Sequence, residues 1–233
     1  MASIIEIDAP DRTRTFPAYC APSKAPCKAA VVVVQEKFGI NADIRQQCQQ
    51  LANAGYLAIA PDLFWRFAAG IELDPEIGSE LAQAIELLSK FDDEQAMLDI
   101  VATVQAIRRM FGSDTRVGVV GHSLGGRLAF MAASRIDVNA SVGYYGVGID
   151  ALLDEKTRIT RPLMLHFARN DHLVDAHAQT RIHRALDNNA WTELHDYEGT
   201  DHGFATALGR RRAEGAAVLA DERTARFLAH WLG

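Results

Sequence analysis

The most informative segment of the sequence is Arg116-Val117-Gly118-Val119-Val120-Gly121-His122-Ser123-Leu124-Gly125-Gly126-Arg127-Leu128. It begins as a short apolar run typical of a strand and continues without a break into an apolar helical pattern. The Gly-x-Ser-x-Gly between the two is the pattern of a nucleophile elbow, a tight turn that exposes a serine hydroxyl. An ordinary turn could contain the same residues by chance, but it would not require both flanking elements. The stretch therefore predicts that Ser123 is a nucleophile at a helix N-terminus, where developing negative charge is stabilised.

Strands and helices alternate on both sides of this stretch. Further strands are predicted at residues 3–8, 15–20, 29–34, 56–60, 141–145, 163–167 and 191–197, and helices at 41–54, 75–90, 94–111, 176–186 and 211–232. The alternation predicts an α/β protein with a mostly parallel, doubly wound sheet, and the first two strands are expected to form an antiparallel hairpin. We expect one α/β-hydrolase domain over residues 1–233. The short segment between the strands at 141–145 and 163–167 has no room for an inserted cap domain.

Composition narrows the function classes. The chain has 233 residues, 48% hydrophobic, and a net charge of −6 without long like-charge runs, which argues against a nucleic-acid partner. We find no apolar run of membrane-spanning length and no secretion signal, so we expect a cytoplasmic protein with no membrane partner. Three cysteines with no metal-like spacing fit a reducing compartment. The expected partner is a small molecule, and the sequence leaves open a monomer or a small homo-oligomer.

A serine nucleophile needs a base, and the base needs an orienting carboxylate. In α/β hydrolases the chain order is serine, acid, histidine, with the acid and the base on loops after late strands. Asp171 follows the strand at 163–167 and is the predicted acid, with Asp175 as a rival that looks more like a helix N-cap. His202 follows the strand at 191–197, flanked by glycines, and is the predicted base. His166 and His195 lie inside strands and are expected to pack or to form hydrogen bonds.

Backbone N–H groups should stabilise the oxyanion, namely those of Leu124 and, after the strand at 29–34, of Lys37. Glu36, beside Lys37, is either a surface carboxylate or a functional group, because a bare charge there would oppose catalysis. Phe38, Phe64, Trp65 and Tyr145 are candidate walls of an apolar substrate pocket and are equally plausible core residues. The sequence shows no metal-ligand spacing and no phosphate-binding loop, so we expect no metal and no cofactor.

Six motifs occur in the order of one family: Val34-Gln35-Glu36-Lys37-Phe38-Gly39, Ala60-Pro61-Asp62-Leu63-Phe64, Gly121-His122-Ser123-Leu124-Gly125-Gly126, Val142-Gly143-Tyr144-Tyr145-Gly146, Asp171-His172 and His202-Gly203-Phe204. Together they resemble the dienelactone hydrolases over nearly the whole chain. The resemblance implies a triad of Ser123, Asp171 and His202. It also implies that Glu36 contacts the resting nucleophile and that Leu124 and Lys37 supply the oxyanion N–H groups.

Two departures from the family pattern bear on the substrate. The dienelactone-cleaving members have a cysteine where this chain has Ser123, and a hydroxyl depends wholly on its base. Those members also bind the dienelactone carboxylate with arginines, where this chain has Thr206 and Leu81. Arg210, Arg127 and Arg66 are possible replacements. Because an unpaired buried carboxylate is costly, a neutral ester or lactone fits this sequence better than the negatively charged dienelactone does.

We therefore predict a serine hydrolase that cleaves a small carboxylic ester or lactone through an acyl-enzyme. One alternative is carboxymethylenebutenolidase (dienelactone hydrolase) activity with a different carboxylate anchor. Another is thioester or amide cleavage by the same triad. A third is a non-catalytic small-molecule receptor on a hydrolase scaffold, which the complete set of triad residues disfavours.

Overall fold

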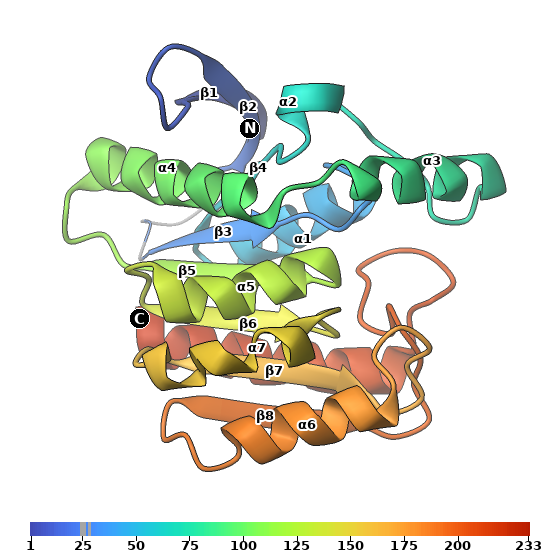
Figure 1. Ribbon diagram of the computed structural model, residues 1–233. Coiled ribbons are helices and arrows are strands. Elements are labelled where there is room, and N and C mark those ends of the chain that lie inside the picture. Colours follow the sequence, from blue (N-terminus) through green and yellow to red (C-terminus); the bar gives the residue numbers. More distant parts are fainter. Residues whose placement is uncertain (24–26, 28) are drawn as a thin grey trace. The chain divides into compact units, whose positions relative to one another are not determined.

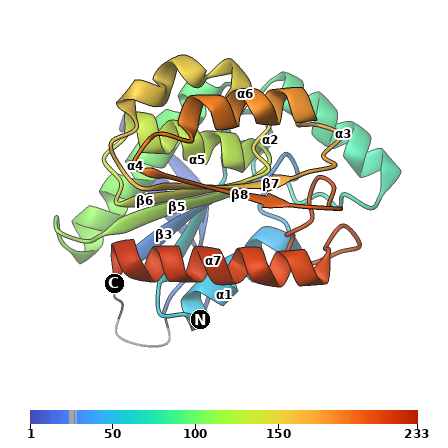
Figure 2. The ribbon, with the colours of Figure 1, turned by 90° about the horizontal axis from the view of Figure 1, so that it is seen from below.

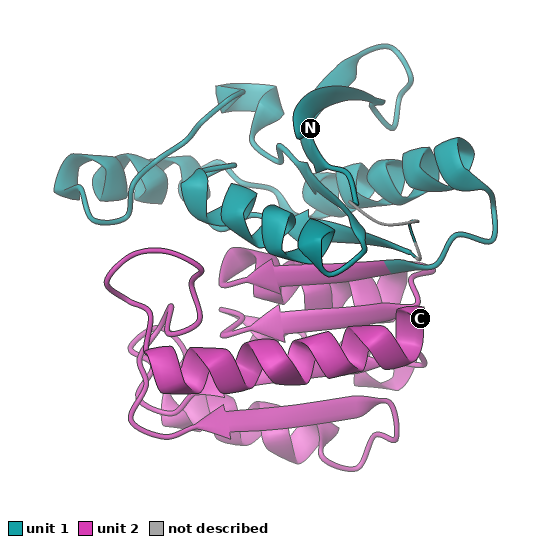
Figure 3. Ribbon diagram, turned by 180° about the vertical axis from the view of Figure 1, so that it is seen from behind, with its two compact units in different colours: residues 1–117 teal, residues 118–233 magenta. Residues whose placement is uncertain are grey.

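The computed structural model describes residues 1–23, 27 and 29–233, and the chain divides into two compact units. Figure 3 colours them separately, Met1–Val117 in teal and Gly118–Gly233 in magenta. The prediction of a single domain over the whole chain therefore stays a prediction.

The described residues of the first unit form four strands and four helices. Its elements are β1 (Ser3–Asp8), β2 (Thr15–Ala21), β3 (Ala30–Val34), α1 (Ala42–Asn53), β4 (Leu57–Pro61), α2 (Trp65–Ala68), α3 (Gly78–Ser89) and α4 (Asp93–Phe111). The strand order is β1-β2-β4-β3, with β1 and β2 as the predicted antiparallel hairpin and β3 parallel to β4. The strands lie between α1 and α4, which cover opposite faces (Figure 2). The continuous Val31–Val34 run is buried on both sides for that reason.

The second unit is a four-stranded parallel sheet with its helices on both faces. Its elements are β5 (Val117–His122), α5 (Leu124–Arg135), β6 (Ala140–Tyr144), two short 3-10 helices (Ile149–Ala151 and Leu153–Arg158), β7 (Leu163–Ala168), α6 (Ala176–Leu186), β8 (Thr192–Tyr197) and α7 (Glu214–Leu232). The strand order is β5-β6-β7-β8, and every neighbouring pair is parallel (Figure 1). Helices α5 and α6 cover one face and α7 covers the other (Figure 2).

The segment between β6 and β7 contains only the two 3-10 helices, so it holds no cap domain, as predicted. In a parallel sheet the C-terminal ends of all strands lie at one edge, and loops there collect functional side chains. The elbow and the loops after β7 and β8 all leave from this edge. The candidate site is therefore assembled within the second unit.

Candidate active site

Ser123 lies at the turn from β5 into α5, in a conformation that L-residues rarely adopt. Its φ is +55° and its ψ is −111°, and it occupies the N-cap position of α5. The backbone N–H of Ser123 donates to the carbonyl of Tyr144 at 2.9 Å, which fixes the turn against β6. A Cβ at Gly121 would lie 2.1 Å from the Gly125 carbonyl oxygen, so only glycine fits there. The strained elbow predicted from the sequence is therefore present.

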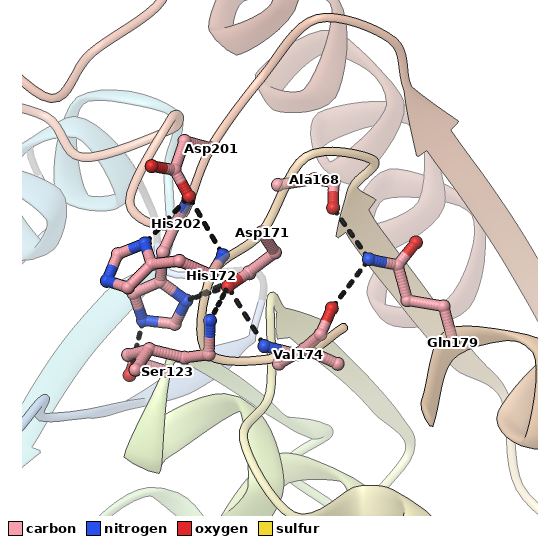
Figure 4. Close-up of polar contacts among 9 residues, drawn as sticks. Ser123, Ala168, Asp171, His172, Val174, Gln179, Asp201 and His202 are labelled. Atoms are coloured by element: carbon pink, nitrogen blue, oxygen red, sulfur yellow. Dashed lines mark hydrogen bonds and ion pairs between the residues drawn. The ribbon is translucent and has the colours of Figure 1, made fainter. Parts of the chain in front are cut away.

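His202 and Asp171 complete a chain of hydrogen bonds that begins at Ser123 (Figure 4). The Ser123 Oγ lies 2.8 Å from Nε2 of His202, and Nδ1 of His202 lies 2.9 Å from Oδ2 of Asp171. The His202 side chain is 5% exposed and the Asp171 side chain is fully buried. The structure thus brings together the three residues predicted from chain order, in the geometry in which a histidine can accept a serine proton.

Asp171 is held by its own loop. Its Oδ1 accepts the backbone N–H groups of Leu173 at 2.8 Å and Val174 at 3.0 Å. The Gln179 amide donates to the carbonyls of Ala168 and Val174, at 2.8 and 2.7 Å, and ties the loop to α6 (Figure 4). These bonds satisfy a carboxylate that water cannot reach and fix its orientation.

The rival acid has another role. Asp175 caps α6, accepting the backbone N–H of Ala178 at 2.8 Å, as its sequence position suggests. Its carboxylate is therefore engaged at the helix terminus, and the geometry favours Asp171 as the acid.

A second imidazole–carboxylate pair lies beside the first, and the sequence analysis missed it. Nδ1 of His172 lies 2.8 Å from Oδ1 of Asp201, and both side chains are exposed. Burial alone would raise the pKa of Asp201, but hydrogen bonds from His172 and from the His202 backbone outweigh it and lower this pKa. The available signal was the repeated Asp-His dipeptide, at 171–172 and 201–202.

Under the elbow, four rings form a ladder across the sheet, one from each strand. Strand register places His122, Tyr144, His166 and His195 side by side. Tyr144 stacks on His122 and on His166, each at 4.3 Å between ring centroids. His166 also bonds Tyr197 at 2.8 Å and Thr224 of α7 at 3.0 Å, which confirms the packed and hydrogen-bonded role predicted for it.

The ladder keeps His166 uncharged. Desolvation, helped by the neighbouring His195, His122 and Arg223, lowers the pKa of His166 well below its ordinary value of 6.5. Desolvation also lowers the pKa of His195. Both ring nitrogens of His166 are bonded within the ladder, to Tyr197 and Thr224, whereas Nε2 of His202 faces the hydroxyl of Ser123.

The remaining predicted residues divide between the units. Tyr145, in the second unit, has φ +39° and packs edge-on against His202 at 4.9 Å, so its ring borders the triad. In the first unit, Phe38 and Phe64 are buried in one core cluster with Leu73, Ala84 and Leu87. Their packing matches the core alternative that the sequence left open.

Glu36 is buried in the first unit, and the ammonium of Lys37 lies 5.4 Å from the ring centre of Phe38. Glu36 is therefore not the surface carboxylate that the sequence allowed as an alternative. Its contact with the nucleophile and the oxyanion role of Lys37 stay predictions.

Trp65 and Arg66 are bound to a buried carboxylate of the first unit. The indole N–H of Trp65 donates to Asp99 at 2.9 Å, and Arg66 makes a two-pronged ion pair with the same fully buried side chain. Trp65 also stacks on Phe16, with ring centroids 5.6 Å apart. An arginine already paired in this way is poorly suited to anchor a substrate carboxylate.

One group in the described part of the chain has the makings of a metal site: Asp171, His172 and Asp201, whose ligand atoms lie within 4.8 Å of one another. Their oxygens already accept N–H donors from His202, from His172 and from the loop backbone. The hydrogen bonds account for the cluster without an ion.

Among the described residues, none of the helices is long and apolar enough to cross a membrane.

A strained serine between a parallel strand and a helix, with a carboxylate and a histidine on the loops after later strands, is the arrangement of an α/β hydrolase. The comparisons agree. A model of the dienelactone hydrolase family matches residues 16–232. The carboxymethylenebutenolidase of Pseudomonas putida is 37% identical over 209 residues, covering 90% of this chain and 88% of the relative. Carboxymethylenebutenolidase 1 of Cupriavidus pinatubonensis is 37% identical over 214 residues, covering 92% and 91%.

A crystal structure from Klebsiella pneumoniae, provisionally named a dienelactone hydrolase, superposes with a TM-score of 0.84 at 28% identity, covering 99% of this chain and all of that one. The chain belongs to the dienelactone hydrolase family and has the α/β-hydrolase fold. It is an enzyme, a hydrolase of carboxylic esters or lactones.

Proposed function

We propose that the enzyme hydrolyses a small carboxylic ester or lactone through an acyl-enzyme on Ser123. The observation that carries the proposal is the unbroken chain of hydrogen bonds from Ser123 through His202 to Asp171. A serine hydroxyl is a weak nucleophile at neutral pH, and this arrangement supplies the base that it needs. The buried carboxylate holds the imidazole in the tautomer whose Nε2 can accept the proton.

In the first half-reaction, Oγ of Ser123 attacks the carbonyl carbon while its proton passes to Nε2 of His202. Asp171 stabilises the resulting imidazolium. The tetrahedral intermediate then collapses, the bond to the leaving oxygen breaks, and that oxygen takes the proton from His202. For an ester the alcohol departs, and for a lactone the leaving hydroxyl stays attached to the acyl group.

In the second half-reaction, His202 takes a proton from water, and the hydroxide formed attacks the acyl carbon. Collapse of the second intermediate releases the acid and returns the proton to Ser123. The N–H of Leu124, the first residue of α5, is the proposed oxyanion donor in the second unit, where the helix dipole favours negative charge. The N–H of Lys37 is the proposed second donor, and Glu36 is proposed to contact the resting nucleophile.

We propose a neutral substrate. Thr206, at one of the two positions where the resemblance implies an arginine, is fully buried. Of the replacement arginines, Arg66 is paired with Asp99. Tyr145 is fully buried and packs edge-on against His202, so we propose that its ring forms the wall behind this imidazole rather than an open face of the pocket. The second candidate is dienelactone hydrolysis proper, which the names of relatives 37% identical to this chain favour.

The test is the hydrolysis of p-nitrophenyl acetate and of cis- and trans-dienelactone side by side. Ser123→Ala should lower kcat by at least ~10³-fold on any substrate that the enzyme turns over. Turnover of the acetate alone supports the neutral-substrate proposal, whereas efficient dienelactone turnover favours the second candidate. Activity that survives in Ser123→Ala would overturn the serine mechanism for either substrate.

A further inference from the structure

A single oxygen of Asp201 collects three N–H groups from the two loops that carry the acid and the base. Oδ1 of Asp201 accepts the backbone N–H of His202 at 2.6 Å. It also accepts the backbone N–H of His172 at 3.1 Å, and it lies 2.8 Å from Nδ1 of the same residue. Since His172 directly follows Asp171, this oxygen ties the loop after β7 to the loop after β8 (Figure 4).

The same contact places a ring against the catalytic imidazole. The ring of His172 packs edge-on to that of His202, with centroids 5.9 Å apart. Tyr145 packs on His202 at 4.9 Å, also edge-on. His202 thus has two aromatic neighbours besides the Asp171 bond at Nδ1, and one of these neighbours is itself oriented by Asp201.

We infer that Asp201 is a positioning residue for the base, acting through the backbone of His202 and through the ring of His172. This inference rests on the proposed role of His202. Proton transfer requires the imidazole to be held within a few tenths of an ångström of its productive position, and a displacement of 1 Å can lower a rate about a hundredfold. Asp201 reaches His202 through the backbone N–H and not through the imidazole, so its role is positioning rather than catalytic.

If Asp201 only stabilised the fold, its loss would lower the fraction of folded enzyme and leave kcat per folded enzyme unchanged. Asp201 and His172 have side chains that are 59% and 64% exposed, and such exposed pairs contribute little to global stability. Loss of the carboxylate should therefore leave the fold intact and misplace the base. The effect should appear in kcat rather than in the fraction of folded enzyme.

The experiment compares three variants by kcat per active site, with sites counted by stoichiometric labelling with a fluorophosphonate. We expect Asp201→Ala to lower kcat by ~10-fold, with KM within ~2-fold of wild type, because the base and not the substrate is misplaced. Asp201→Asn keeps an acceptor oxygen for the same N–H groups and should restore kcat to within ~2-fold of wild type. Asp175→Ala is the matched control: it also removes an exposed carboxylate that accepts a backbone N–H, here that of Ala178 in α6, and should leave kcat unchanged.

A double mutant separates positioning from general damage. If Asp201 acts through His202, adding Asp201→Ala to His202→Ala should cause no further loss of the residual activity. The inference is overturned if Asp201→Ala keeps wild-type kcat per labelled site, or if its loss is undiminished in the His202→Ala background. A failure of the proposed function would appear elsewhere, as activity retained in Ser123→Ala.

Discussion

Asp171 pairs with His202, and Asp201 pairs with His172, so the two Asp-His dipeptides of the chain are joined crosswise. The two pairs have the same chemistry and nearly the same bond length, but opposite surroundings. In the first, the side chains are at most 5% exposed; in the second, both are more than half exposed. Only the buried pair continues to a serine hydroxyl. Position in the fold, rather than the dipeptide itself, decides which pair can do nucleophilic chemistry.

Burial changes the energetics of each pair. Water cannot reach the Asp171 carboxylate, so hydrogen bonds from the N–H groups of Leu173, Val174 and His202 must stabilise it instead. The Asp201 carboxylate can exchange a lost partner for water. The buried pair is therefore rigid and intolerant of change, whereas the exposed pair can hold loops together at little cost in stability.

The largest expected difference between the pairs is in rate. Asp171→Asn should lower kcat/KM by ~10³- to 10⁴-fold, because an amide at this place favours the wrong imidazole tautomer. The same exchange at Asp201 should change kcat/KM by less than ~2-fold. Steady-state kinetics of the two variants, each normalised to labelled sites, checks the contrast. Equal losses would show that the pairs are not distinguished as described.

The next difference is in stability. Asp171→Ala should lower the free energy of unfolding by ~2–4 kcal/mol, because it leaves a buried imidazole and two loop N–H groups without their acceptor. Asp201→Ala should cost less than ~1 kcal/mol, as is usual for exposed pairs. Urea unfolding of both variants measures the difference. A larger cost at Asp201 than at Asp171 would contradict the comparison.

His166 adds a third case to the comparison, because its imidazole is completely buried and is not paired with a carboxylate. Because the pKa of His166 is well below 6.5 in the folded state, the unfolded chain binds more protons as the pH falls. The contribution of His166 to the free energy of unfolding should therefore be fully present above pH 6.5. Below that pH it should be lost, by up to about 1.4 kcal/mol for each pH unit per histidine. His195 should add to the decline, because its pKa is lowered too.

The check is urea unfolding at several pH values between about 7.5 and 5. The variant His166→Gln keeps a polar side chain in the ladder and lacks the titration. Its stability should depend less on pH than that of the wild type over this range. Equal slopes in the two proteins would show that His166 does not titrate as described.

Much of this was predictable from the sequence because the signals are local. The glycines around Ser123 and the strand-to-helix pattern specify the elbow, and chain order then leads to Asp171 and His202. Element ends were less well defined: the helix predicted over 75–90 runs from Gly78 to Ser89, and the one over 211–232 begins at Glu214. Such ends depend on capping bonds that side-chain patterns indicate only in part.

Other features required the register of the sheet. The ladder from His122 to His195 exists because four residues far apart in sequence fall opposite one another on parallel strands. The crossed pairing of Asp201 with His172 likewise depends on two loops that meet only in the folded unit. From the sequence, Phe64 was equally plausible as a pocket residue and as a core residue, and the structure places it in a core cluster. Spacing along the chain carries none of this information.

The central claim is that Ser123 carries the acyl group. The most direct measurement is mass spectrometry of enzyme quenched in acid during turnover of p-nitrophenyl acetate, followed by peptide mapping. We predict one acetyl group per chain, on the peptide that contains Ser123, and none in Ser123→Ala. An acetyl group on any other residue, or undiminished turnover in Ser123→Ala, would contradict the account.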